Sequence, residues 1–360
     1  MSEPQPPVVD AVEDLTPEWL TAALRSGGLD VTVASVDHRP VGTGQMAESH
    51  RLTLTFDADA DADAGPATVV AKVPAQGPES RAAGAAGGYA NEVGFYRDLA
   101  HTVTIRVPEC HYAAIGSDLG RFVLVLEDLA PAEQGDQLAG CTVEQAGAAV
   151  ETLAGLHGPR WCDPTLFDVT WLQRVTPETS FFLGELMRSA TDGFVDRYRG
   201  RMSGDDIDTL QAFAAVTHDW LAARPERFGL VHGDYRLDNL LFGTAAGGSP
   251  AAAVDWQTLG VGLPARDLAY FLGNGLLPED RRAHERALVE RYHTALVAQG
   301  VEGHSLDECW EDYCLGHGQG PLITVLGAMH VEQTDRGDDM FMAMISRSGQ
   351  ALRDLDTLAL

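Results

Sequence analysis

The stretch LVHGDYRLDNLLF at residues 230–242, followed by AAAVDWQTLG at 251–260, decides the fold of this chain. Short apolar runs flank the polar loop and precede Asp255, which predicts buried strands with polar side chains at their ends. Asp234 can accept a proton, whereas Asn239 and Asp255 can hold magnesium. An acid, an amide five residues later and a second acid after the next apolar run form the pattern used for phosphoryl transfer from a nucleotide.

This loop carries a family resemblance. Asp234 taken alone is compatible with a turn or a helix cap, but the whole pattern H-G-D-x-x-x-x-N favours catalysis. HGDYRLDN followed by DW resembles the aminoglycoside phosphotransferase and ecdysteroid kinase-like family, small-molecule relatives of protein kinases. The resemblance implies Asp234 as the base and Asn239 and Asp255 as magnesium ligands. Gly233 and Trp256 depart from H-R-D and D-F-G, which disfavours a protein kinase.

The resemblance also implies a fold. We expect an α+β, protein-kinase-like bilobal fold with a small N-terminal lobe at 1–126, a hinge at 127–131 and a larger, mostly helical lobe at 132–360. The small lobe would hold an antiparallel sheet and one main helix. A chain of 360 residues also exceeds the size that one hydrophobic core usually serves.

A glycine-rich turn opens the expected nucleotide site. Gly42 and Gly44 lie in VGTGQMAESHRLTLTF at 41–56, where RLTLTF alternates at strand period. In a kinase, such a turn covers phosphates with backbone N–H groups. Two alternatives are a plain hairpin turn and a dinucleotide fingerprint that ends at Ala47. The fingerprint requires a helix after it, whereas the pattern at 49–56 predicts a strand.

Lys72 and Glu92 are the next candidates. Lys72 lies in the β-branched run TVVAKVP at 68–74, and Glu92 lies where a helix is predicted to begin after a glycine pair. A lysine in an apolar strand needs an anion if it is buried. In kinases a strand lysine pairs with a helix glutamate and holds the nucleotide phosphates. Taken singly, Lys72 is equally compatible with an edge charge, and Glu92 with a helix-dipole partner.

A hinge is expected after the central strand at 122–126. The resemblance implies that backbone groups around Glu127 to Leu129 contact the nucleotide base, and it places Leu241 at the same site. An ordinary strand exit with an acidic end is the alternative.

Two further residues are assigned to the catalytic loop. We hypothesise that Arg236 stabilises charge on the transferred phosphoryl group; a salt bridge to Asp238 or a solvent-facing position is the alternative. The resemblance suggests that Asp267, in LPARDLAYFL, braces the loop. It is equally compatible with a first-turn helix acid.

Helical patterns dominate the C-terminal half. Thr142 caps a helix that ends at His157, which we interpret as a cap or core contact rather than a catalyst. Further helices are predicted at 278–298 and within 305–330. The resemblance implies that these helices, together with 165–224, wall the acceptor pocket. Residues 310–313 (WEDY) offer aromatic and acidic groups for a cation, or form one amphipathic helix.

Composition narrows the class of protein. The chain has 25 Lys and Arg against 53 Asp and Glu, a net charge of −28, which disfavours nucleic-acid binding. This acidity suits a cationic acceptor or serves solubility alone. DADADADAG at 57–65 is interpreted as a solvated hairpin tip. Five scattered cysteines without a C-x-x-C pair indicate reduced thiols and a cytoplasmic protein, and no apolar run is long enough to cross a membrane.

The predicted function is a phosphotransferase that depends on Mg²⁺ and uses ATP or GTP. It would transfer the γ-phosphoryl group to a hydroxyl of a small acceptor such as an aminoglycoside, another antibiotic, an amino alcohol, a sugar or a steroid-like molecule. A protein kinase and an inactive nucleotide-binding module are the alternatives. The identity of the acceptor, the choice of nucleotide and the oligomeric state stay open at this point.

Overall fold

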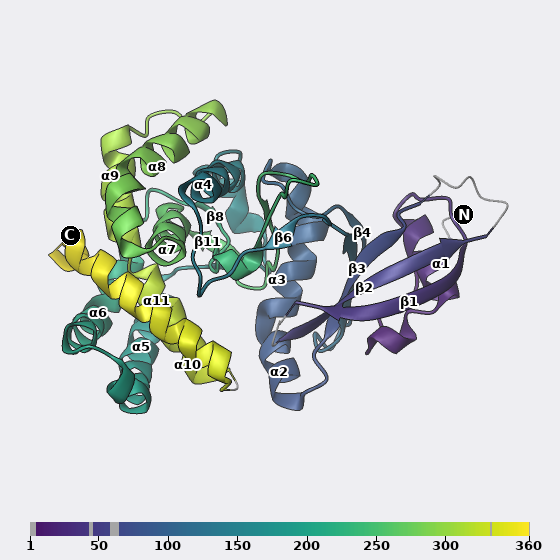
Figure 1. Ribbon diagram of the computed structural model, residues 1–360, viewed down its shortest axis with the longest axis horizontal. Coiled ribbons are helices and arrows are strands. Elements are labelled where there is room, and N and C mark those ends of the chain that lie inside the picture. Colours follow the sequence, from purple (N-terminus) through teal and green to yellow (C-terminus); the bar gives the residue numbers. More distant parts are fainter. Residues whose placement is uncertain (1–4, 43–45, 58–64, 332, 360) are drawn as a thin grey trace. The chain divides into compact units, whose positions relative to one another are not determined.

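The computed structural model describes residues 5–42, 46–57, 65–331 and 333–359. The chain divides into two compact units (Figure 1). Unit 1 comprises Met1–His101, Val107–Ala130 and Asp255–Thr258, and unit 2 comprises Thr102–Arg106, Pro131–Val254 and Leu259–Leu360. A single cut along the chain would therefore misplace two short segments, one of which carries Asp255. Gly44 and residues 58–64 of the acidic stretch lie outside the described residues.

Unit 1 is built on a five-stranded antiparallel sheet in the order β1-β2-β3-β5-β4. Its strands are β1 (Val33–Val41), β2 (Ala47–Phe56), β3 (Thr68–Pro74), β4 (Cys110–Ile115) and β5 (Phe122–Glu127). Val41 pairs with Ser49, so β1 and β2 are antiparallel neighbours. From Ala47 the chain forms a strand, and the dinucleotide fingerprint, which needs a helix there, is excluded.

One helix covers part of this sheet. Helix α1 (Pro17–Ser26) begins where Thr16 accepts a hydrogen bond from the backbone of Trp19 at 3.2 Å, with proline at the first position. Trp19 packs edge-on against Tyr112 of β4, with ring centroids 5.4 Å apart. Leu20 and Leu24 are fully buried, so the apolar face of α1 completes the core of unit 1.

The main helical stretch of unit 1 is irregular. It consists of α2 (Pro78–Ala83), a π-helical segment (Gly84–Gly88), α3 (Tyr89–Gly94), a second π-helical segment (Phe95–Leu99) and a 3₁₀ turn (Ala100–Thr102). Gly87 has φ 145°, which residues with a Cβ rarely adopt. Helix α3 therefore begins directly after the glycine pair, where the sequence predicted a helix start, but it is preceded by wider turns.

Unit 2 is mainly helical, with short strands. Its helices are α4 (Val143–His157), α5 (Pro177–Tyr198), α6 (Gly204–Ala222), α7 (Ala265–Gly275), α8 (Pro278–Ala298), α9 (Leu306–Gly316), α10 (Gln319–His330) and α11 (Asp335–Asp354). Its strands are β6 (Glu133–Gln134), β7 (Gln173–Arg174), β8 (Gly229–Val231), β9 (Leu240–Phe242), β10 (Ala252–Ala253) and β11 (Gly260–Gly262). They form two small sheets in the orders β10-β9-β6 and β7-β11-β8.

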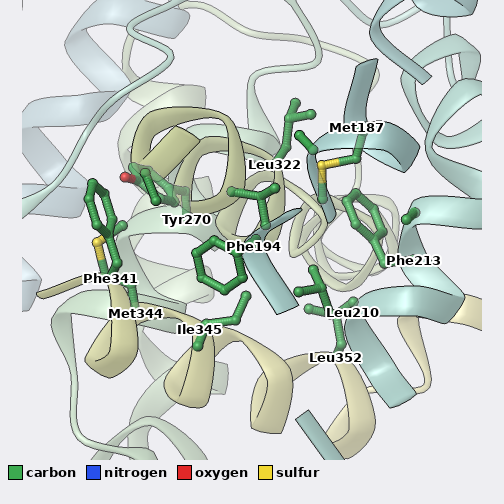
Figure 2. Packing of buried hydrophobic residues seen from close by; sticks show 14 of the residues in the cluster. Met187, Phe194, Leu210, Phe213, Tyr270, Leu322, Phe341, Met344, Ile345 and Leu352 are labelled. Carbon is green, nitrogen blue, oxygen red and sulfur yellow. The ribbon is translucent and has the colours of Figure 1, made fainter. Parts of the chain in front are cut away.

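The apolar core of unit 2 joins six helices, α5, α6, α7, α9, α10 and α11 (Figure 2). Its labelled members are Met187 and Phe194 of α5, Leu210 and Phe213 of α6, Tyr270 of α7, Leu322 of α10, and Phe341, Met344, Ile345 and Leu352 of α11. Every residue of α7 is buried. A helix surrounded in this way is held by packing on all sides, so it is a rigid support for the loop that it contacts.

Several sequence predictions are confirmed by these elements. Helix α4 has the predicted Thr142 cap, and Gln145 completes a capping box. Strand β3 and helix α8 have the predicted bounds. Antiparallel sheet and helices in unit 1, with a mostly helical unit 2, make up the expected α+β fold. Among the described helices, none is both long and apolar enough to cross a membrane.

Candidate active site

A buried ion cluster on the sheet of unit 1 surrounds Lys72. Only 10% of this side chain is exposed, and its Nζ lies 2.8 Å from Oε1 and 2.7 Å from Oε2 of Glu92. A third carboxylate oxygen, Oδ1 of Asp255, lies 3.2 Å away. Burial lowers the pKa of Lys72, but Asp255 and Glu92 raise it above its ordinary value. The side chain therefore stays charged in an apolar setting that would reject an unpaired ammonium.

The segment that carries Asp255 is anchored to α3 and its continuation. Trp256 is buried and stacks on Phe95, with ring centroids 3.7 Å apart. Asn91 donates a hydrogen bond to the carbonyl of Gln257 at 3.0 Å. Asp255 has φ 67°, a left-handed backbone conformation that aspartate tolerates better than most residues. With 35% of its side chain exposed, Asp255 presents a carboxylate that both Lys72 and solvent reach.

The remaining nucleotide-site candidates of unit 1 lie at strand ends. Gly42 follows β1 with φ 75° and open space around it, and Gly44 lies outside the described residues. Glu127 ends β5, and its carboxylate accepts a hydrogen bond from the backbone of Glu109 at 2.9 Å. Leu129 follows in irregular chain, and no described residue accepts its N–H. The N–H of Glu127 donates to the carbonyl of Glu109, so Leu129 offers the backbone group that a nucleotide hinge requires, and contact with a base stays a prediction.

The catalytic loop of unit 2 runs from β8 to β9, and residues of α7 and α10 support it by hydrogen bonds to its backbone. Asp267 accepts hydrogen bonds from the backbone N–H of His232 at 2.6 Å and of Gly233 at 2.9 Å. Gln319 donates to the carbonyl of Gly233 at 2.8 Å. Gly233 has φ 81°, so this tight turn favours glycine. Asp267 also stands in the first turn of α7, so both sequence interpretations of this residue hold.

His157 belongs to the same support. It is fully buried at the end of α4, where Nε2 lies 3.3 Å from Oδ2 of Asp267 and Nδ1 lies 2.6 Å from the hydroxyl of Tyr292. Both ring nitrogens are therefore engaged inside the protein. This agrees with the interpretation of His157 as a core contact rather than a catalyst.

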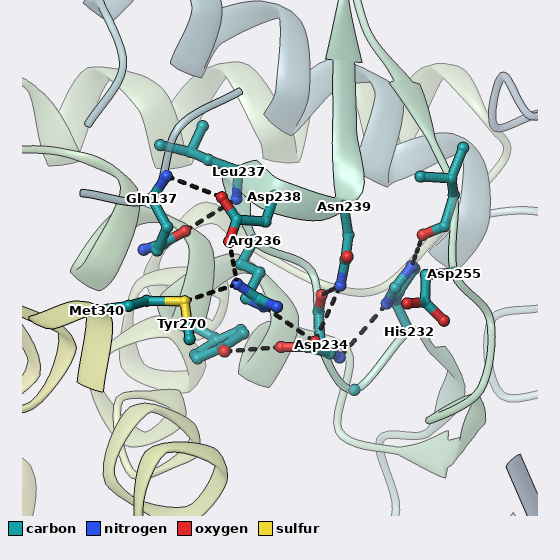
Figure 3. Close-up of polar contacts among 12 residues, drawn as sticks. Gln137, His232, Asp234, Arg236, Leu237, Asp238, Asn239, Asp255, Tyr270 and Met340 are labelled. Atoms are coloured by element: carbon teal, nitrogen blue, oxygen red, sulfur yellow. Dashed lines mark hydrogen bonds and ion pairs between the residues drawn. The ribbon is translucent and has the colours of Figure 1, made fainter. Parts of the chain in front are cut away.

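Three side chains hold the carboxylate of Asp234 (Figure 3). Oδ2 accepts from Arg236 Nε at 3.0 Å and from Asn239 Nδ2 at 2.9 Å. Oδ1 accepts from the hydroxyl of Tyr270 at 2.8 Å. The side chain is 20% exposed, so it is fixed by its neighbours yet reachable from solvent. A carboxylate held in this way is oriented before any substrate arrives.

Arg236 is held between two carboxylates. Its Nη1 lies 2.8 Å from Oδ2 of Asp238, so the ion pair that the sequence offered as an alternative is present. The same nitrogen lies 3.1 Å from the sulfur of Met340. Burial lowers the pKa of Arg236, but Asp234, Tyr270 and Asp238 raise it well above its ordinary value. The guanidinium is therefore permanently charged beside Asp234, while its action on a phosphoryl group stays a prediction.

Asn239 has the chemistry that a magnesium ligand needs. Its Nδ2 donates to the carbonyl and to Oδ2 of Asp234, both at 2.9 Å. These two bonds fix the amide, and its Oδ1 accepts no hydrogen bond from any described residue. Magnesium prefers oxygen ligands and keeps several waters. The amide oxygen of Asn239 in unit 2 and the part-exposed carboxylate of Asp255 in unit 1 are each an oxygen ligand of the kind that this ion prefers.

Comparison with known proteins identifies the family. Residues 59–317 match the model of the phosphotransferase enzyme family, which is well over half of the chain. The chain belongs to the phosphotransferase enzyme family. No curated protein matches this phosphotransferase in sequence.

Solved structures share the fold of this phosphotransferase. Aminoglycoside 2'-phosphotransferase-IIIa, solved as its GDP complex, is 14% identical, with 92% of this chain and 98% of that chain covered and a TM-score of 0.54. Ethanolamine kinase of Plasmodium vivax is 10% identical, with 87% and 81% covered and a TM-score of 0.51. Amicoumacin kinase hAmiN, solved with AMP-PNP, Ca²⁺ and its ligand Ami, is 13% identical, with 87% of each chain covered and a TM-score of 0.51. At these identities the similarity shows the fold, which is the protein-kinase-like one that was expected.

The structure gives less support to two groups of residues that the sequence suggested for the nucleotide and acceptor sites of the phosphotransferase, namely Leu241 and the aromatic residues of α9. Leu241 is half-buried in β9, opposite Ala252. The aromatic residues of α9 have partners within the protein: the guanidinium of Arg286 lies 3.6 Å above the ring of Trp310, and Tyr313 donates to Glu285 at 2.8 Å. This favours the amphipathic-helix interpretation of α9 over a cradle for a cationic substrate.

Within the described part of the chain, no group of three or more His, Cys, Asp or Glu is arranged to hold a metal.

Sequence reasoning missed Tyr270 and Gln319. Tyr270 lies three residues after Asp267, so the two share one face of a helix, and this spacing was a usable signal once Asp267 was assigned to the loop. Gln319 begins α10, 86 residues after the glycine that it contacts, and no local pattern marks it.

Proposed function

We propose that this protein transfers the γ-phosphoryl group of ATP or GTP to a hydroxyl group of a small molecule. The observation that supports it most is the carboxylate of Asp234, held by Tyr270, Arg236 and Asn239 in a loop braced by Asp267. A carboxylate held in this way suits the task of orienting a hydroxyl and accepting its proton.

The other residues take complementary roles in this proposal. Lys72, kept charged between Glu92 and Asp255, binds phosphate oxygens of the nucleotide. Backbone groups at Gly42 cover the phosphates, and those around Glu127 and Leu129, with the side chain of Leu241, contact the base. Arg236 stabilises charge on the phosphoryl group during transfer.

Asn239 and Asp255 are proposed to hold Mg²⁺. The fixed amide of Asn239 supports this assignment, because its oxygen is the part of the side chain that Asp234 leaves unused. When bound, Mg²⁺ neutralises charge on the β- and γ-phosphates.

The proposed acceptor carries an amine as well as a hydroxyl. Related folds include an aminoglycoside phosphotransferase and an ethanolamine kinase, and the names of both indicate amine-bearing acceptors. The net charge of −28 favours the approach of such cations. GDP and AMP-PNP in related structures leave both ATP and GTP as donors to test. A cytoplasmic location is part of the proposal, and it is supported by the five cysteines, all of which are free thiols.

The test is a phosphoryl-transfer assay with Mg²⁺, ATP or GTP, and a panel of aminoglycosides, amino alcohols, sugars and sterols. We expect transfer to at least one amine-bearing acceptor, and a loss of about 10²- to 10⁴-fold in Asp234→Asn. Near-normal turnover in Asp234→Asn would show that the base is assigned wrongly. Phosphate on serine of a test protein would favour a protein kinase, and nucleotide binding without transfer would favour an inactive binding module.

A further inference from the structure

Helix α7 contacts the catalytic loop twice from one face. Asp267 binds the backbone of His232 and Gly233, and Tyr270, one turn later, reaches the carboxylate of Asp234. Residues three apart lie side by side on a helix. Because the whole of α7 is buried, the two contacts set the loop backbone and the Asp234 side chain relative to the same rigid element.

The hydrogen bonds of Asp234 distinguish its two oxygens. A carboxylate offers about four lone-pair sites, two on each oxygen. On Oδ2 both sites are used, by Arg236 and Asn239. On Oδ1 only Tyr270 donates among the described residues, so one lone pair is left for a further donor. The Asp234 side chain as a whole is 20% exposed, so a donor from solvent can approach its carboxylate.

We propose that Tyr270 is a positioning residue and that Oδ1 of Asp234 is the atom that accepts the proton of the acceptor hydroxyl. This inference rests on the proposed function. In the step, the acceptor O–H bond breaks and its proton joins Oδ1, while the acceptor oxygen forms a bond to the γ-phosphorus of the nucleotide. The bond from that phosphorus to the β-phosphate oxygen breaks, and the nucleoside diphosphate leaves with the electron pair.

Tyr270 is suited to this task. Its side chain is fully buried in the core of unit 2, so its rotamer is held by packing. Burial, reinforced by the charge of Asp234, raises the pKa of Tyr270 well above its ordinary value. The hydroxyl therefore keeps its proton and donates to Oδ1 at all working pH values.

The test compares two tyrosine variants. Tyr270→Phe removes the hydroxyl bound to Asp234, and Tyr313→Phe removes one bound to Glu285, also buried and also at 2.8 Å. We expect kcat to fall by about 10- to 100-fold in Tyr270→Phe, with KM for the nucleotide unchanged. Tyr313→Phe should keep the kcat of the wild type. Its thermal stability should fall about as much as that of Tyr270→Phe, because each variant loses one buried hydrogen bond.

A double-mutant cycle with Asp234→Ala separates positioning from a structural role. If Tyr270 acts through Asp234, adding Tyr270→Phe to Asp234→Ala lowers the residual kcat no further. A full additional loss, or a wild-type kcat in Tyr270→Phe while Asp234→Ala is impaired, would overturn the inference and leave the proposed function standing. Absence of transfer by the wild-type protein to every acceptor would instead overturn the proposed function, and the inference with it.

Discussion

Asn239 donates its side-chain amide to both the carbonyl and the carboxylate of Asp234, at 2.9 Å in each case. Two residues five positions apart are thereby locked together within one loop. The nitrogen end of the amide serves Asp234, while the oxygen end stays available for a metal. One side chain thus links the two functions that the loop is proposed to combine.

Two substitutions of Asn239 separate these functions. Asn239→Asp keeps an oxygen ligand but loses both donors and adds a like charge beside Asp234, whereas Asn239→Ala also loses the ligand. We expect kcat to fall by tenfold or more, on the order of 1.4 kcal/mol, in both variants. Only Asn239→Ala should need more Mg²⁺ for half-maximal activity, as measured by initial rates over a Mg²⁺ titration. Full kcat in Asn239→Asp would show that its bond to Asp234 is dispensable.

Arg236 can be tested against a second arginine that shares its partner. Arg336 lies 3.3 Å from Asp238 but makes no contact with Asp234 among the described residues. We expect Arg236→Ala to lower kcat by about 10²-fold with a smaller loss of nucleotide affinity, because a charge beside the reacting group is removed. Arg336→Ala is the control and should keep its kcat. Loss of nucleotide binding without loss of turnover in Arg236→Ala contradicts the assignment.

Removing one charge of the Lys72–Glu92 pair should destabilise the protein more than removing both charges. Lys72→Met leaves Glu92 buried without its cation, which typically costs about 3–5 kcal/mol of unfolding free energy. Lys72→Met combined with Glu92→Leu removes both charges and should be more stable than Lys72→Met alone. Urea unfolding measures both effects. Equal stability of the two variants would mean that water, or a proton taken up by Glu92, compensates for the lost cation.

Asp128 lies next to the expected hinge, and we expect its contact with Arg51 to be sensitive to acid. Arg51 lies 2.6 Å from its carboxylate. Burial raises the pKa of Asp128, but hydrogen bonds from Arg51 and Thr68 outweigh it and lower the pKa below 3.8. Because the folded-state pKa is the lower one, this contact stabilises the protein above pH 3.8, and the stabilisation is lost as the pH falls through the folded-state value. In unfolding curves between pH 5 and about 2, Asp128→Asn should therefore lose less stability than the wild type.

Local patterns in the sequence were sufficient for much of the fold. The Thr142 cap and the β-branched run of β3 both gave correct elements, since each depends on residues within a short stretch of the chain. The loop at 230–242 was also recognisable, because a catalytic loop must hold its reacting groups at a short, fixed spacing.

Contacts between distant residues were less predictable. Arg236 was compatible with either Asp238 or a phosphoryl group, and only the structure shows the ion pair. Tyr270 was given no role from the sequence; it lies in the core of unit 2, yet its hydroxyl reaches Asp234 across 36 positions. The segment from Asp255 to Thr258 likewise belongs to unit 1, although the residues on both sides of it belong to unit 2.

The sequence by itself determined several strands and helices and the spacing of Asp234, Asn239 and Asp255, because periodicity, caps and turns are local properties. Tertiary structure alone decided which oxygen of Asp234 is left with a lone pair. That outcome depends on how α7 packs against the loop, and a helical pattern specifies the buried face of a helix but not the group that this face meets.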